Sequence, residues 1–198
     1  MAAPTPKTTY PTFSAIYTHI LTLPPPLTPP AKPTSPALTP HISALSLHPT
    51  LEAALHILNN DLPSAHFLVR HMQAPPAHEG MFLHGILHRI EGDYENARAW
   101  YGNVAGSAVF EEVWGGGGEE EARGFIGRVE GFVKRAEGEK EVLGEESLRE
   151  IKAVVEYCRR KFGEEEVLDA TGAWVKPGEE HRRMGEEMVS GGEGFRKF

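Results

Sequence analysis

Histidines are the residues of this chain best placed to do chemistry, because seven of the ten lie between His48 and His88. His84 and His88 are four residues apart, so on a helix both imidazoles project from one face, and Glu91 continues that face by another turn. Two such histidines with a nearby carboxylate can hold Zn²⁺, Fe²⁺ or Mn²⁺, and His66 on the preceding helix is a candidate further ligand. One hypothesis is therefore a divalent metal centre at these four residues.

The same group can also work without a metal, because His titrates nearest to neutral pH and can serve as general acid and base. The candidate catalytic residues are then His66, His84, His88, Arg89 and Glu91. A structural interpretation is favoured over both. Histidines between paired helices often donate to a carbonyl, a carboxylate or a hydroxyl, and Tyr94, Tyr101 and Glu91 are near enough in sequence to serve as partners. The established zinc motif on a helix places Glu directly after the first His, where this chain has Gly85.

The elements that must position these residues are two helices joined by a capped turn, over residues 79–104. Each helix has apolar residues at helical spacing. Gly92 can adopt the left-handed conformation past the first helix, and Asp93 can accept hydrogen bonds from the free N–H groups of the second. The apolar positions are Phe82, Leu83, Ile86, Leu87 and Ile90 on the first helix, and Tyr94, Ala97, Trp100, Tyr101 and Val104 on the second.

This hairpin repeats an earlier one at a period of 32 residues. The aligned residues are Leu55-His56 with Leu87-His88, Asp61 with Asp93, and Ala65 with Ala97. A fixed period in this range is typical of stacked helical hairpins. The stretch 50–104 resembles the tetratricopeptide repeat, with Gly85, Ala97 and Tyr101 at positions where the two helices approach closely. It departs from that family in its slightly short period and in lacking a proline after the second helix. The resemblance implies an all-α fold of stacked antiparallel hairpins.

A second resemblance is carried by Ala65-His66 followed by HGILHRIEGDYENARAWY at residues 84–101. It is similar to a group of short fungal and bacterial proteins with the pattern AH…HGxxHRxEGDxxNAxxWY. The resemblance covers about a quarter of the chain and implies a fungal, cytosolic protein. The positions that it singles out are His66, His84, His88, Arg89, Glu91 and Asn96.

Composition divides the chain into three parts. Twelve of the sixteen prolines lie in the first fifty residues, which predicts a largely disordered arm over residues 1–47 with a short amphipathic helix at about 13–22. That helix either docks on a partner or, as we favour, covers an apolar groove of its own domain. Residues 48–163 are predicted to form the helical core, with a flexible glycine loop at 115–118 and further helices at 119–136 and 146–162. Residues 164–198 are predicted to be an extended tail with a last short helix near 179–188.

The charge pattern excludes some classes of partner. The net charge is −8 and no basic stripe is present, so nucleic acid is not an expected partner. No apolar run approaches the length needed to cross a bilayer. Cys158 is the single cysteine, so no disulfide can form within the chain and a reducing compartment is expected. It lies on the apolar face of a predicted helix, where its thiol should be inert. We expect a cytoplasmic protein, with a mitochondrial location as the minor alternative.

Two functions from different classes follow from these features. The first is a small adaptor or interaction module that binds a protein or peptide, based on the repeat, the acidic face and the flexible ends. The alternative is a His-based or metal-dependent enzyme whose pocket lies between the helices that carry His66 and residues 84–91. The arrangement of the imidazoles distinguishes them, because converging ring nitrogens favour a site and singly buried rings favour packing.

Overall fold

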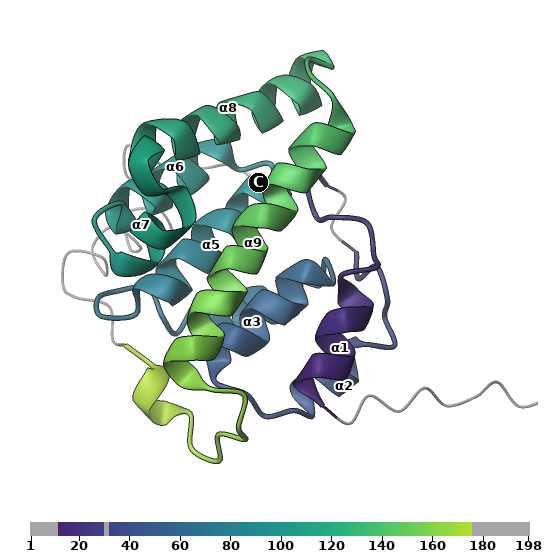
Figure 1. Ribbon diagram of the computed structural model, residues 1–198, viewed down its shortest axis with the longest axis vertical. Helices are drawn as coiled ribbons and strands as arrows, with labels where there is room; N and C mark the ends of the chain where they lie inside the picture. Colours follow the sequence, from purple (N-terminus) through teal and green to yellow (C-terminus); the bar gives the residue numbers. More distant parts are fainter. Residues whose placement is uncertain (1–11, 30–31, 176–198) are drawn as a thin grey trace, which may run out of the picture.

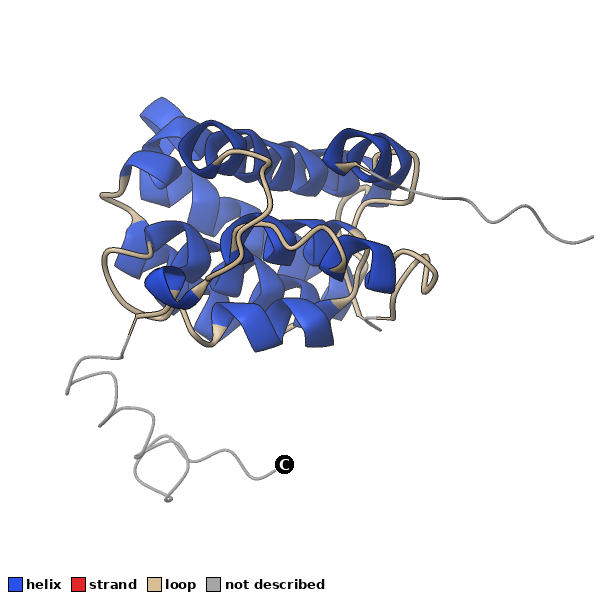
Figure 2. Ribbon diagram, turned by 90° about the horizontal axis from the view of Figure 1, so that it is seen from below, coloured by secondary structure: helices blue, strands red, loops and turns tan. Residues whose placement is uncertain are grey.

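The computed structural model describes residues 12–29 and 32–175, and these residues form helices connected by short loops. The elements are α1 (Phe13–Ile20), α2 (Thr39–Ser43), α3 (Pro49–Leu58), α4 (Leu62–Val69), α5 (His78–Glu91), α6 (Tyr94–Val104), α7 (Ala108–Trp114), η1 (Gly115–Gly117), α8 (Gly118–Arg135), α9 (Lys140–Phe162) and η2 (Thr171–Ala173). They pack in stacked layers without a strand in the described part of the chain (Figures 1 and 2). The predicted all-α class is confirmed. None of the helices in these two ranges combines the length and apolarity needed to cross a bilayer.

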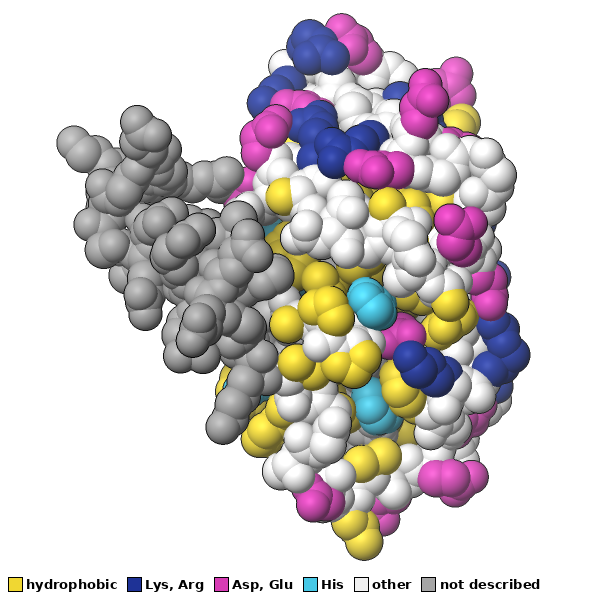
Figure 3. Space-filling model, turned by 90° about the vertical axis from the view of Figure 1, so that its left-hand side faces the viewer, with side chains coloured by type: hydrophobic (Ala, Val, Ile, Leu, Met, Phe, Trp, Pro, Cys, Tyr) yellow, Lys and Arg dark blue, Asp and Glu magenta, His cyan; other side chains and the backbone are white. Residues whose placement is uncertain are grey.

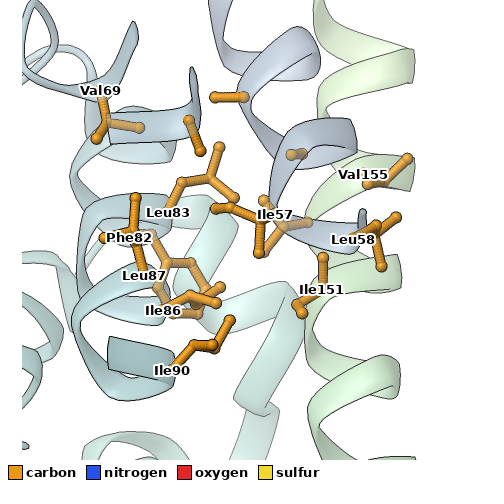
Figure 4. Close-up of a cluster of buried hydrophobic side chains, with 14 of the residues drawn as sticks. Ile57, Leu58, Val69, Phe82, Leu83, Ile86, Leu87, Ile90, Ile151 and Val155 are labelled. Carbon is orange, nitrogen blue, oxygen red and sulfur yellow. The ribbon is translucent and has the colours of Figure 1, made fainter. Parts of the chain in front are cut away.

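Helix α5 lies at the centre of the core. It contacts α3, α4, α6, α7 and α9, so it is enclosed on most sides. Its predicted apolar stripe is fully buried, and side chains of this stripe face Ile57 of α3 and Ile151 of α9 (Figure 4). Met81 and His84, on its other predicted stripe, are buried as well. The histidine face of α5 is therefore turned toward neighbouring helices.

The two hairpins of the repeat have matching turns. Asn60 and Gly92, which are equivalent at the period of 32 residues, both have left-handed backbones, with φ of 57° and 84°. The next residues, Asp61 and Asp93, are the N-caps of α4 and α6, and each carboxylate accepts from the backbone N–H three residues along. The cap predicted at Asp93 is confirmed, and Asp61 forms the same cap at the equivalent position of the first hairpin. Helix α5 contacts both α3 and α4, so the hairpins are packed together, and their likeness to tetratricopeptide stacking remains a prediction.

The N-terminal part differs from the predicted arm. Residues 12–29 and 32–47 pack on the helical core, to which they contribute Phe13, Ile16, Tyr17, Ile20, Leu27, Leu38, Ile42 and Leu47. Helix α1 contacts α2 and α3, as expected for a helix that covers its own domain (Figure 1). The physical reason is that α3 alone cannot cover its own apolar surface, so the leucines and isoleucines between the prolines complete the core. Residues 1–11 lie outside the described ranges.

The C-terminal half contains more helix than predicted. The glycine run expected to be a flexible loop forms η1 and the first residue of α8, with positive φ at Gly115 and Gly118 turning the chain sharply between α7 and α8. Helix α7 was not predicted. Helix α9 begins at Lys140, before the predicted start, because Leu143 is buried and a Cβ at Gly144 would lie 3.7 Å from Pro25. Tertiary packing thus converts an expected connector into the first turns of a helix.

The described part of the tail folds back onto the domain. The backbone N–H of Val167 donates to the Ser46 carbonyl at 2.7 Å, and that of Val175 donates to the His71 carbonyl at 2.8 Å. Val175 also forms a parallel bridge with Met72. Residues 164–175 are therefore anchored by long-range hydrogen bonds, whereas the helix predicted near 179–188 lies outside the described residues.

Candidate metal centre

Three imidazoles meet between α4 and α5. Nε2 of His66 and Nε2 of His84 share a hydrogen bond of 3.1 Å, and one ring nitrogen from each of His66, His84 and His88 lies within 4.8 Å of the others. The face of the molecule drawn in Figure 3 exposes a few histidine side chains among hydrophobic and charged ones. The ring nitrogens therefore converge, which is the arrangement that we expected of a site.

Helix geometry explains the arrangement of the rings. His84 and His88 are one turn apart on α5, and their rings stack with centroids 4.8 Å apart and planes at 13°. His66 comes from α4 and meets both rings edge-on, with interplanar angles of 82° to His84 and 86° to His88. The contact of α4 with α5 thus aims one imidazole edge at the two stacked rings.

Glu91 faces the opposite side of two of these rings. Its Oε1 lies 3.4 Å from Nδ1 of His66, and its Oε2 lies 3.5 Å from Nδ1 of His88. A carboxylate placed at Nδ1 keeps that nitrogen protonated and leaves the Nε2 lone pair available. Glu91 was predicted as a ligand in the first coordination sphere. In the structure its carboxylate lies beside Nδ1 of His66 and Nδ1 of His88.

His84 is the most buried member of the cluster. Its ring stacks on Trp100, with centroids 4.5 Å apart, and its Nδ1 is buried without a hydrogen-bond partner in the described part of the chain. Burial lowers the pKa of His84 from 6.5 to about 2, and the neighbouring imidazoles and the Arg70 guanidinium act in the same direction. The ring is therefore neutral at physiological pH, which is the protonation state that a metal ligand requires.

His88 also contacts the aspartate that caps the next helix, as the equivalent His56 does in the first hairpin. Its Nδ1 lies 3.8 Å from Asp93, and the equivalent His56 has Nδ1 3.2 Å from Asp61. In both hairpins the aspartate N–H also donates to the carbonyl of the same histidine, at 2.8 Å for Asp61 and 2.9 Å for Asp93. Each pair ties the end of one helix to the cap of the next. The structural interpretation agrees with the Glu91 and Asp93 carboxylates beside His88, whereas the Tyr101 hydroxyl donates to Glu150 instead.

Arg89 belongs to a different part of the core. Its guanidinium is fully buried and donates to Glu150 at 2.7 Å and to Ser147 at 3.2 Å. Tyr101 donates to Glu150 at 2.7 Å, and burial together with that carboxylate raises the pKa of the Tyr101 hydroxyl. The hydrogen-bond partners of Arg89 are Tyr101, Ser147 and Glu150, so the structure does not bring its guanidinium together with the three imidazoles. Its role is to tie α5 to α9.

Two further predictions concern residues outside the cluster. The Asn96 side chain donates to the Asp93 carboxylate at 2.8 Å, so it supports the cap that faces His88 rather than the ring nitrogens. Cys158 is buried, and burial raises the pKa of its thiol, which agrees with the expected inert role. Sequence reasoning did not assign Trp100 to the site. Its position on the predicted inner face of α6 was the available signal.

Comparisons of this chain with protein-family models, with curated proteins and with solved structures found no match. The two resemblances inferred from the sequence therefore stay predictions, and the function has to be argued from the side chains.

Proposed function

We propose that this protein binds one divalent transition metal ion through His66, His84 and His88. The observation that carries the proposal is the 3.1 Å separation between Nε2 of His66 and Nε2 of His84. Two imidazole nitrogens on a tetrahedral zinc ion, each about 2.0 Å from it, are about 3.3 Å apart. The three nitrogens already lie within 4.8 Å of one another, so a movement of about 1.5 Å completes the triangle.

The surroundings support an ion with one open position. Glu91 faces Nδ1 of two of the rings, as second-sphere carboxylates commonly do for zinc-bound histidines. The side chains of His66 and His88 are 19% and 14% exposed, so solvent can reach the site. Three imidazoles favour zinc, with Fe²⁺ and Mn²⁺ as alternatives. A water at the fourth position of such an ion ionises near neutral pH, which is the basis of metal-dependent hydration or hydrolysis.

The adaptor function receives less support from the surface. A helical repeat that binds a peptide needs a continuous exposed face. Among the large exposed hydrophobic side chains of the described residues, Phe67 and Trp174 both contact the His71 ring. The others lie on different elements, and they are Val133, Val142 and Leu168. We therefore base the proposed function on the imidazole cluster.

Metal titration tests this proposal. Protein purified without an affinity tag is treated with chelator, dialysed, and titrated with Zn²⁺, Fe²⁺ and Mn²⁺ by calorimetry, with elemental analysis of the loaded protein. One equivalent of metal is expected, and the His84→Ala, His88→Ala double variant should bind none. A matched double variant, His71→Ala with His78→Ala, lies outside the cluster and should still bind one equivalent. Zinc at about one hundred times its Kd should stabilise the fold by about 2.7 kcal/mol.

Glu91→Gln distinguishes an orienting carboxylate from a ligand. Loss of a second-sphere partner weakens metal binding about 10- to 100-fold without changing the stoichiometry. Absence of metal binding by the parent protein, or full binding by the His84→Ala, His88→Ala variant, would refute the proposal.

A further inference from the structure

The first hairpin contains a serine, a histidine and an aspartate in a row. Nε2 of His56 lies 3.4 Å from Oγ of Ser43, and Nδ1 of the same ring lies 3.2 Å from Oδ2 of Asp61. Ser43 is the last residue of α2, His56 lies in the last turn of α3, and Asp61 is the N-cap of α4. Three elements therefore converge to form a hydroxyl–imidazole–carboxylate sequence.

The order of burial suits nucleophilic chemistry. Ser43 is exposed, whereas His56 and Asp61 are buried. The hydroxyl can thus meet a substrate while the imidazole and carboxylate are shielded from water. Ser43 and His56 line an open hollow of about 400 Å³. The arrangement is the one that activates a serine: a base within reach of the hydroxyl, and a third group that orients the base.

The carboxylate of Asp61 is held in place from two sides. Oδ2 accepts a hydrogen bond from the Thr39 hydroxyl at 2.7 Å, and Oδ1 accepts from the Ser64 N–H at 3.5 Å as the helix cap. Oδ2 of Asp61 lies 3.2 Å from Nδ1 of His56 without the geometry of a hydrogen bond, and a carboxylate this close favours the tautomer that has its proton on Nδ1 and its lone pair on Nε2. Glu52 lies 3.7 Å from the same Nε2, so it is the other group that competes for this nitrogen.

The second hairpin shows what is specific to the first. The equivalent pair, His88 with Asp93, has imidazoles rather than a hydroxyl on its other side. The histidine and aspartate therefore share a hairpin-linking role in both copies. Ser43 comes from α2, outside the repeat, so its position against His56 is an additional feature of the first copy.

We propose that Ser43, His56 and Asp61 hydrolyse carboxylic esters. Oγ of Ser43 attacks the ester carbonyl carbon while its proton passes to Nε2 of His56. The bond from the carbonyl carbon to the alkoxy oxygen then breaks, and the leaving alcohol takes that proton, which leaves Ser43 acylated. Water attacks the acyl carbon as His56 accepts its proton, and return of this proton to Oγ releases the carboxylic acid and restores the serine.

The lining of the hollow indicates the class of substrate. Phe67, which keeps 67% of its exposure, lies there with Leu68 and Pro63, so an apolar group of the ester has a surface to contact. Ser64 lines the same hollow, so its hydroxyl is a candidate donor to the carbonyl oxygen as negative charge develops on it. Glu52 is the charged side chain of this lining and disfavours anions, so neutral, apolar esters are the expected substrates.

Covalent labelling of the full chain tests the proposal. A fluorophosphonate probe reacts with activated serines, and mass spectrometry locates the adduct, which is expected on Ser43. Hydrolysis of p-nitrophenyl butyrate is measured in parallel, with chelator present so that the result does not depend on the proposed metal centre. Ser43→Ala should abolish both labelling and turnover. His56→Gln should lower kcat/KM at least about 100-fold by removing the general base.

Controls separate a specific effect from loss of folding. Ser43 is exposed, so Ser43→Ala should retain the parental Tm and circular dichroism spectrum. Ser14→Ala changes an exposed serine of α1 and should keep parental labelling and turnover. Failure of the parent protein to label at Ser43, or equal turnover by parent and Ser43→Ala, would overturn the proposal even if the histidine cluster binds metal.

Discussion

Removal of the Arg89 charge should cost a large part of the stability of this protein. Its guanidinium lies fully buried, 2.7 Å from Glu150 and 4.6 Å from the centroid of the Phe125 ring. In Arg89→Met the Glu150 carboxylate stays buried and loses its cation, keeping hydrogen bonds from Tyr101 at 2.7 Å and Trp114 at 3.2 Å. Loss of one partner of a buried ion pair costs about 3–5 kcal/mol. Since domains are stable by about 5–15 kcal/mol, this is about a fifth of the total or more.

A second substitution tests whether the cost comes from the orphaned charge. Glu150→Gln keeps an oxygen that can accept from Tyr101 and Trp114 while it removes the negative charge. Arg89→Met with Glu150→Gln should therefore be about 1–3 kcal/mol more stable than Arg89→Met alone, because neither charge is buried without a partner. Glu150→Gln alone should be destabilised, since it leaves the guanidinium unpaired.

Urea denaturation followed by circular dichroism measures these differences, with the m-value as a check that the same surface is exposed on unfolding. Arg128→Met is the matched control, because Arg128 pairs with Glu146 at the surface with 51% of its side chain exposed. That pair should contribute less than about 1 kcal/mol. A double variant no more stable than Arg89→Met, or an Arg89→Met cost equal to that of Arg128→Met, would refute the argument from buried charge.

Two further predictions concern α5. Because the pKa of His84 is lowered from 6.5 to about 2, the unfolded chain binds a proton below pH 6.5 that the folded protein does not. As the pH falls from about 6 to about 4, the free energy of unfolding should thus fall by about 1.4 kcal/mol per pH unit. Urea denaturation at several pH values measures this dependence, and the change per pH unit should be smaller in His84→Asn. An unchanged pH dependence in that variant would contradict the lowered pKa of His84. A Cβ at Gly85 would lie 2.8 Å from the Tyr101 ring, so Gly85→Ala should lower Tm. The control is Gly127→Ala in α8, which has nothing within 4 Å of the new Cβ and should raise stability by about 1 kcal/mol. A higher Tm for Gly85→Ala than for Gly127→Ala would contradict this reasoning.

Local features of the chain were predictable because their causes are local. The caps at Asp61 and Asp93 and the left-handed Gly92 depend on backbone groups within a few residues, so residue type and spacing predict them directly. The central apolar stripe of α5 and the pairing of two helices in each hairpin follow from helical periodicity in the same way. The common face of His84 and His88 follows from their four-residue spacing alone.

Predictions at the prolines and glycines were wrong because packing against distant residues decides what these segments do. Pro24, Pro25 and Pro26 stop a helix, but they do not prevent neighbouring apolar residues from entering a core, as Leu27 does. Gly144 lies within α9, where an added Cβ would be 3.7 Å from Pro25, more than one hundred residues away. Local propensity therefore described the ends of elements better than which segments belong to the domain.

Residue spacing by itself determined the helical class, the two hairpins and the side of α5 that carries imidazoles. The tertiary structure alone decided that His66 would meet His84, that Glu91 would face the outer nitrogens, and that Ser43 would lie against His56. The difference is physical. Helical periodicity orients a side chain about its own axis, whereas the distance between groups on different helices depends on how the whole core packs.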